Sequence, residues 1–184
     1  MESFLLNGRT VSLRPITLDD VSPRYVAWLR DPEVNRYLET RLTEQTIETV
    51  RNFVERVMAS ADEHLFAICV DGEHVGNIKV GPIRAYHRLA DVSLFVGERH
   101  AWGQGVATAA ITLISRHAIR DLGLHKLHAG VYAPNVASAK AFLRAGYRQE
   151  GVRRRHCFLD NGPTDLLEFG LCADEMPGLP EHQS

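Results

Sequence analysis

Two glycines separated by a single residue, Gly103 and Gly105, follow an apolar run at residues 92–96 and precede a helical pattern. In that pattern, apolar side chains recur three or four residues apart from Val106 to Leu122. The order predicts a strand, a glycine turn and a helix. The first N–H groups of such a helix lack partners and lie at the positive end of its dipole. Glycine lets a ligand approach the backbone. The segment therefore suits a phosphate group, and a plain structural turn is the alternative.

A carboxylate lies on the strand that leads into this turn. Asp91 alternates with apolar residues over 90–96, on the strand face that it shares with Ser93 and Phe95. A carboxylate beside an anion site can act as a general base. The alternative is an ion pair with Arg84 or Arg88 at the start of the strand.

Composition excludes several classes of protein. The 184 residues are 45% hydrophobic, which favours one domain with a full core, and the net charge of −2 gives no general attraction to nucleic acid or anionic membranes. The three cysteines are scattered, and His125 and His128 lack a helical spacing and a third ligand, so we expect neither disulfides nor a metal site. The first residues are too short and acidic for a signal peptide, and no apolar run reaches membrane-spanning length. We expect a cytoplasmic protein.

The other segments predict alternating helices and strands. A strand at 11–14 precedes a helix that starts near Leu18, after the capping pair Thr17 and Asp20, and ends at Asp31-Pro32. A short turn at 33–38 and a helix capped by Thr43 follow. We then expect strands at 65–70, 74–80, 90–96 and 126–132, a helix from Asn135 to Arg144, and a hairpin of 147–159 with 166–171. Residues 1–172 form the predicted domain, and the polar tail from 173 to 184 is expected to be disordered.

This order and two motifs resemble the GNAT superfamily of N-acetyltransferases, over about Gly8 to Leu171. The family signature Q/R-x-x-G-x-G/A matches residues 102–107, with Trp102 in place of the first Gln or Arg. That departure is typical of the branch that resembles ribosomal-protein N-terminal alanine acetyltransferases. The segment from Asn135 to Tyr147 is similar to the family's N-x-x-A/S-x-x-x-Y-x-x-x-G-F element. The resemblance implies a single α/β domain: a mixed, mostly antiparallel sheet with flanking helices, whose parallel strands 90–96 and 126–132 splay apart around the CoA arm.

The resemblance also implies site residues for acetyl-CoA as co-substrate. The expected cofactor-binding residues are Leu94, Phe95, Val96, Trp102, Gly103, Gln104, Gly105, Val106, Ala107, Thr108, Asn135, Ser138 and Phe142. The expected catalytic residues are Asp91, as base for the amine, with Asn135 and Ser138. The family's tyrosine acid falls on Phe142, which has no proton to give. Ser138 or a water held by Asn135 can replace it, or the thiolate departs unprotonated.

The segment 28–38 resembles the first-helix region of this branch, which lines the acceptor side, but the acceptor itself is open at this stage. We expect acetyl transfer to a primary amine by direct attack in a ternary complex, because no activated nucleophile is evident. A small-molecule amine is the preferred acceptor and a protein N-terminus the runner-up. A CoA-binding regulatory module without turnover is the third possibility, because Phe142 replaces the acid. We expect no nucleic acid, membrane or metal partner, and a monomer or homodimer.

Overall fold

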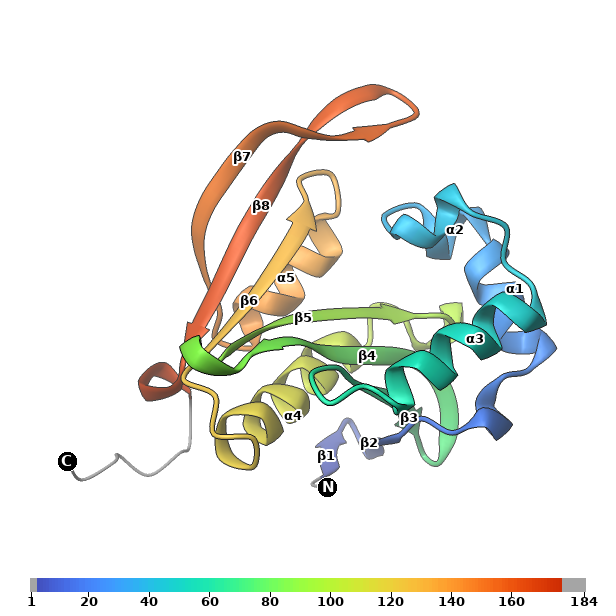
Figure 1. The fold of residues 1–184 in the computed structure, drawn as a ribbon, viewed down its shortest axis with the longest axis horizontal. Coiled ribbons are helices and arrows are strands. Elements are labelled where there is room, and N and C mark those ends of the chain that lie inside the picture. Colours follow the sequence, from blue (N-terminus) through green and yellow to red (C-terminus); the bar gives the residue numbers. More distant parts are fainter. Residues whose placement is uncertain (1–2, 177–184) are drawn as a thin grey trace.

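One sheet of eight strands dominates the computed structural model, which describes residues 3–176 (Figure 1). Its strand order is β1-β2-β3-β4-β5-β6-β8-β7. Their bounds are β1 Ser3–Leu6, β2 Arg9–Pro15, β3 His64–Val70, β4 Glu73–Arg84, β5 Leu89–Val96, β6 Lys126–Tyr132, β7 Arg148–Leu159 and β8 Gly162–Cys172. All neighbouring strands are antiparallel except β5 and β6, which are parallel. The predicted mixed α/β sheet is confirmed.

The parallel pair β5 and β6 separates along its length. Backbone pairing covers Leu89 with Lys126, Ala90 with Leu127 and Asp91 with His128, and ends there. Beyond this point β6 stays with β8 and β5 stays with β4, so the two halves of the sheet diverge (Figure 1). The predicted splay is therefore confirmed, and its closed end lies at Asp91 and His128.

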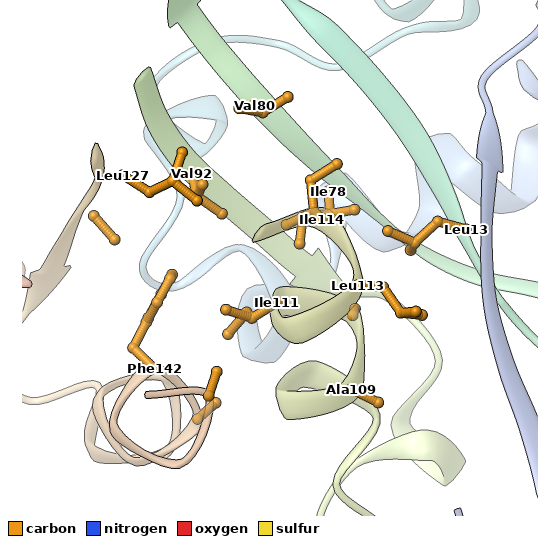
Figure 2. Close-up of a cluster of buried hydrophobic side chains, with 14 of the residues drawn as sticks. Leu13, Ile78, Val80, Val92, Ala109, Ile111, Leu113, Ile114, Leu127 and Phe142 are labelled. Atoms are coloured by element: carbon orange, nitrogen blue, oxygen red, sulfur yellow. The ribbon is translucent and has the colours of Figure 1, made fainter. Parts of the chain in front are cut away.

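Five α-helices cover the two faces of the sheet within the described residues. They are α1 Pro23–Arg30, α2 Pro32–Asn35, α3 Ile47–Met58, α4 Val106–Arg120 and α5 Val136–Arg144. On one face, α4 and α5 pack on the larger core, where Ile111 and Ile114 of α4 meet Val92, Leu127 and Phe142 (Figure 2). On the other face, α1 and α3 pack on β3 and on Phe95 through a second cluster. Both faces of β5 are therefore held by core packing, through Val92 on one face and Phe95 on the other.

The segment before α1 differs from the single predicted helix. Leu18–Asp20 is a 3-10 turn, and it uses the predicted capping pair of Thr17 and Asp20. A separate helix then begins at Pro23, with Ser22 as its N-cap. Proline keeps the residue before it out of the helical region, and Ser22 is extended at φ −130°. The helix cannot run through from Leu18 for this reason.

The predicted cap of α3 was also misplaced. Thr46, not Thr43, is the N-cap, and its hydroxyl accepts a hydrogen bond from the Thr49 amide at 3.1 Å. Thr49 Oγ1 accepts in return from the Thr46 amide at 2.8 Å. Two orphan amides are thus satisfied reciprocally, which a cap at Thr43 does not offer.

Three further differences concern an extra strand, the end of β4 and the C-terminal tail. β1 was not predicted, although Asn7 and Gly8, with φ of 50° and 79°, form the type of turn that joins hairpins. β4 continues past the expected stop at Gly81-Pro82, because an irregularity between Val80 and Ile83 takes both residues out of the ladder. The expected disordered tail starts too early: Ala173–Glu175 is a 3-10 turn and Met176 is buried, while residues 177–184 lie outside the described part.

Candidate active site

The glycine turn leaves a set of free backbone donors at the start of α4. Gly105 is the N-cap, with φ of +84°, and contributes no side-chain cap. The first amides of α4 therefore lack partners within the helix. Gly103 is also left-handed, at φ +71°, and a Cβ built there has nothing within 4 Å. The turn thus combines positive potential with an open approach to the backbone.

The start of α5 lies near this turn. Asn135 is the N-cap of α5, and its Oδ1 accepts a hydrogen bond from the Ser138 amide at 3.2 Å. The Asn135 amide in turn donates to the Tyr132 carbonyl at 2.8 Å, which fixes α5 to the end of β6. The predicted cap is confirmed.

A cavity of about 640 Å³ lies between these two helix starts and the end of β5. This volume is within the usual range of ligand sites, about 300–1,000 Å³. Its lining comes from four segments: the end of β5, the glycine turn with the start of α4, the start and one face of α5, and the residues around α2. The lining residues are, in this order, Leu94, Phe95, Val96; Ala101, Trp102, Gly103, Gly105, Val106, Ala107, Thr108; Asn135, Val136, Ala137, Ser138, Lys140, Ala141, Arg144; and Glu33, Val34, Tyr37, Leu38. One end therefore offers backbone amides, and the walls are largely apolar.

The segment after α2 connects the two halves of the molecule above the splay. Tyr37 donates through its hydroxyl to the Pro134 carbonyl at 3.3 Å. Arg41 donates to the Phe158 carbonyl of β7 at 2.9 Å, and the Tyr132 hydroxyl of β6 donates to Glu39. We call residues 37–41 the bridging segment. These contacts hold it against β6, β7 and the loop before α5.

The comparisons with known proteins identify the family. The model of the acetyltransferase (GNAT) domain matches residues 10–148, which is most of the chain. The chain belongs to the GNAT family of acetyltransferases. The turn, the cavity and the splayed strands all lie in or beside the matched region.

Relatives of this GNAT chain extend over nearly its full length. The uncharacterized N-acetyltransferase YoaA of Bacillus subtilis (strain 168) is 28% identical over 171 residues, covering 91% of this chain and 96% of YoaA. RimJ of Mycobacterium smegmatis, solved with CoA-disulfide, superposes with a TM-score of 0.83 at 22% identity, covering 96% of this chain and 88% of RimJ. Spermidine N-acetyltransferase of Vibrio cholerae, solved with CoA and spermine, superposes with a TM-score of 0.79 at 16% identity, covering 90% of this chain and 96% of that enzyme. The two solved structures show that the fold is shared.

The GNAT enzyme is an N-acetyltransferase with acetyl-CoA as co-substrate, and the cavity fits that molecule. Acetyl-CoA carries a diphosphate, an apolar arm and a terminal thioester. Free amides at the start of α4 suit the diphosphate, and the strip of Leu94, Phe95 and Val96 suits the arm. Among the described residues, no group of His, Cys, Asp and Glu could hold a metal ion, and no helix is long and apolar enough to cross a membrane.

Most of the residues expected to bind the cofactor line this cavity. Gln104 and Phe142 do not. The side chain of Gln104 turns outward: its Oε1 accepts from Arg9 at 3.1 Å and its Nε2 donates to the His100 carbonyl at 2.6 Å. Gln104 can thus offer a ligand only its backbone. Trp102 lines the cavity and is fixed by a hydrogen bond from its Nε1 to the Val96 carbonyl at 2.8 Å.

The predicted contact of Phe142 with the cofactor is wrong. Phe142 is 2% exposed and lies in the core, with its ring centroid 5.0 Å from that of Tyr147 and 6.2 Å from that of Phe169. The same turn of α5 presents Ala141 to the cavity instead. The large buried surface of the aromatic ring explains this orientation. Ser138 and Asn135 do line the cavity, so they stay candidates for the group that protonates the thiolate.

Asp91 lies outside the cavity, at the closed end of the splay. Its Oδ2 accepts a hydrogen bond from Arg84 at 3.1 Å. The ion pair that was the alternative to a general base is therefore present, with Arg84 and not Arg88 as the partner. Its Oδ1 is 2.9 Å from Nδ1 of His128 on β6. The hydrogen bond from His128 and the charge of Arg84 hold the pKa of Asp91 below its ordinary value, although partial burial opposes this. A carboxylate with a lowered pKa is a weaker proton acceptor.

Several lining residues were not predicted. Lys140 and Arg144 line the cavity from α5, and their spacing of four residues places them on one helix face. That spacing, counted from the cap at Asn135, was visible in the sequence. Glu33 and Tyr37 also line the cavity, and they belong to the segment 28–38, for which the resemblance implied a place on the acceptor side.

Proposed function

We propose that the enzyme transfers the acetyl group of acetyl-CoA to the primary amine of a small molecule, by direct attack in a ternary complex. The observation that carries the proposal is a continuous cavity that joins the amide-rich start of α4 to the residues around α2. A donor held at one end and an acceptor admitted at the other then meet without an intermediate on the protein.

The cofactor assignments rest on charge and shape. The amides of Gly103–Thr108 hold the diphosphate, and Leu94, Phe95 and Val96 guide the arm toward the closed end of the splay. Lys140 and Arg144 add positive charge on the α5 wall for a further phosphate. Asn135 and Ser138 supply polar atoms beside the arm, where Ser138 or a bound water protonates the departing thiolate.

Direct attack is preferred over an acyl-enzyme because the cavity offers no activated nucleophile. None of the residues that line it is a cysteine, and among the described residues Ser138 makes no hydrogen bond to a histidine. The three free cysteines, Cys69, Cys157 and Cys172, lie elsewhere, and Cys69 is buried. Both substrates must therefore be bound together when the bond forms.

The bridging segment favours a small acceptor over a protein chain. Arg41 and Tyr37 tie it to β7 and to the loop before α5, so the acceptor side is enclosed by backbone-anchored contacts. A free amine on a compact molecule can enter beside such a bridge, whereas a polypeptide needs an open groove. The resemblance to ribosomal-protein N-terminal alanine acetyltransferases keeps a protein N-terminus as the second candidate, and the fold shared with spermidine N-acetyltransferase places polyamines among the small amines to test.

The test is release of CoA thiol from acetyl-CoA in the presence of single amines: polyamines, amino sugars, aminoglycosides, amino acids and short peptides with a free N-terminus. The proposal predicts release with a small amine and intersecting initial-rate lines when both substrates are varied. Release with peptides alone would favour the protein acceptor. Binding of acetyl-CoA without release for any amine would favour a regulatory module.

A further inference from the structure

His128 lies at the point where the parallel strands separate. It is paired with Asp91 in the last backbone pair of β5 and β6. Leu127 and Ala129 on either side of it point into the core beneath α4, so His128 points to the opposite face. Next on that face come Gly130 of β6 and Ser93 of β5, and both are exposed. A space open to solvent therefore begins directly beside His128.

The hydrogen bond to Asp91 fixes which nitrogen of His128 is free. An ionised carboxylate can only accept, so Nδ1 of His128 carries the hydrogen that bridges 2.9 Å to Asp91 Oδ1. In the neutral ring, Nε2 then holds a lone pair. It faces Oε1 of Glu168 at 3.7 Å, which is also only an acceptor. Two acceptors that face each other fit a cationic donor, such as an ammonium group.

We propose that His128 is the general base that takes the proton from the acceptor ammonium, with Asp91 as its positioning residue. This inference rests on the proposed function and names the group that serves it. The ammonium loses one proton to His128 Nε2, and the neutral nitrogen attacks the thioester carbonyl. The C–N bond forms and the C–S bond breaks. The second proton that the nitrogen loses reaches the thiolate through Ser138 or the bound water. His128 returns its proton to solvent, since its side chain is 28% exposed.

The surrounding charges suit a histidine that gains a proton. Two carboxylates lie against the ring, from Asp91 on β5 and Glu168 on β8, and both stabilise the imidazolium. Each is held by an arginine: Arg84 of β4 binds Asp91 at 3.1 Å and Arg153 of β7 binds Glu168 at 2.6 Å. Two further basic side chains lie near these carboxylates and lower their pKa values by charge: Lys79 of β4 near Asp91, and His156 of β7 near Glu168.

This role goes to His128 rather than to Asp91 for two reasons. Asp91 already accepts from two donors, and both lower its pKa, so its proton affinity is reduced. Both oxygens of Asp91 face donors, whereas Nε2 of His128 faces only an acceptor, and imidazole is the side chain that most often serves as a general base. The arrangement of carboxylate, imidazole and open lone pair is the one that orients a histidine base.

The test compares His128→Asn with the wild-type enzyme on the best amine from the panel. Asparagine can keep a donor to Asp91 but offers no base. We expect kcat to fall by ~10²-fold or more, with acetyl-CoA affinity unchanged. The loss should shrink as pH rises toward the amine pKa of ~10, because the substrate is then already neutral. His125→Gln is the matched control, since His125 contacts the Arg88 carbonyl instead, and it should keep the wild-type rate.

Asp91→Asn tests the positioning role. The acidic limb of the kcat/KM profile should move to lower pH, because the imidazolium loses one of its two carboxylates. His128→Gln and thermal melts guard against misfolding of a single variant. If His128 were only a strand-to-strand link, both His128 variants would melt earlier yet keep the wild-type rate and pH profile, and the inference would be overturned. Failure of the wild type to release thiol with any amine would instead overturn the proposed function, and this inference with it.

Discussion

Replacing Gly103 by alanine tests the cofactor end of the cavity. Gly103 lines the cavity with φ of +71°, and an added Cβ meets nothing within 4 Å, so it points into open space. The left-handed backbone costs an alanine about 1–2 kcal/mol of folding free energy. For a domain of this size that lowers Tm by about 2–8 °C. The methyl group also stands where a phosphate must approach the amides of the turn.

The effect on affinity follows from the lost hydrogen bonds. A hydrogen bond to a charged group contributes about 1.5–3 kcal/mol. Loss of one such bond raises the Kd of acetyl-CoA by about 10–200-fold. Isothermal titration calorimetry at fixed ionic strength measures this directly, on protein that circular dichroism shows to be folded.

Gly123→Ala is the matched control. Gly123 follows α4 with φ of +66°, and its added Cβ also meets nothing within 4 Å, but it does not line the cavity. It should lose the same stability and keep its affinity for acetyl-CoA. Equal affinities in the two variants would refute the assignment of the turn as the phosphate site.

Three further predictions concern the core, the bridging segment and the acid stability. Phe142→Tyr should lower stability by about 1–3 kcal/mol, seen in a urea titration, because its hydroxyl enters a packed core without a partner; turnover per folded molecule should stay unchanged. Arg41→Lys should raise KM for the amine by about 2–10-fold, by weakening the contact with the Phe158 carbonyl, while calorimetry shows unchanged acetyl-CoA affinity. Asp20→Asn should cost about 2 kcal/mol at pH 7, because Arg14 and the Thr17 amide lower the pKa of Asp20 to about 2 against the effect of burial. That difference should be complete above pH ~4 and vanish as the pH falls toward the folded pKa, as urea midpoints at several pH values report.

Each of these has a contrary outcome. A faster Phe142→Tyr enzyme would restore this position as the site of the family's acid. An Arg41→Lys enzyme with weaker acetyl-CoA binding and unchanged KM for the amine would place the bridging segment on the cofactor side. A pH-independent difference for Asp20→Asn would mean that the ion pair with Arg14 does not stabilise the folded state.

The elements with local signals could be predicted from the sequence. The strand at 126–132, the cap at Asn135 and the glycine turn were all correct, because each depends on its own residues. The parallel, splayed strands followed from the resemblance to the family and are confirmed by the pairing that stops at Asp91. The starts of α1 and α3 were predicted wrongly because each has two possible N-caps close together in the sequence. Pro23 sets the start of α1, and the reciprocal hydrogen bonds of Thr46 and Thr49 set the start of α3.

The site was predictable where the backbone makes it and less so where distant side chains meet. The turn at 102–108 presents backbone amides at the start of α4, and these follow from the glycine spacing. Phe142 was misassigned because its orientation depends on Phe169, which is far along the chain. The pairing of Asp91 with His128 was invisible for the same reason: the two residues lie on strands that the fold alone places side by side. Only the structure shows that the carboxylate of Asp91 accepts a hydrogen bond from the imidazole of His128.

The transfer of an acetyl group from acetyl-CoA to an amine is the central claim. Acetyl-CoA labelled with carbon-13 in the acetyl group, incubated with the wild-type enzyme and the amine panel, tests it most directly by mass spectrometry of all products. We predict a labelled N-acetyl amine in the same molar amount as the free CoA, and unlabelled protein. Free CoA with labelled acetate alone, or a labelled protein side chain that forms before the product, would contradict direct transfer to an amine.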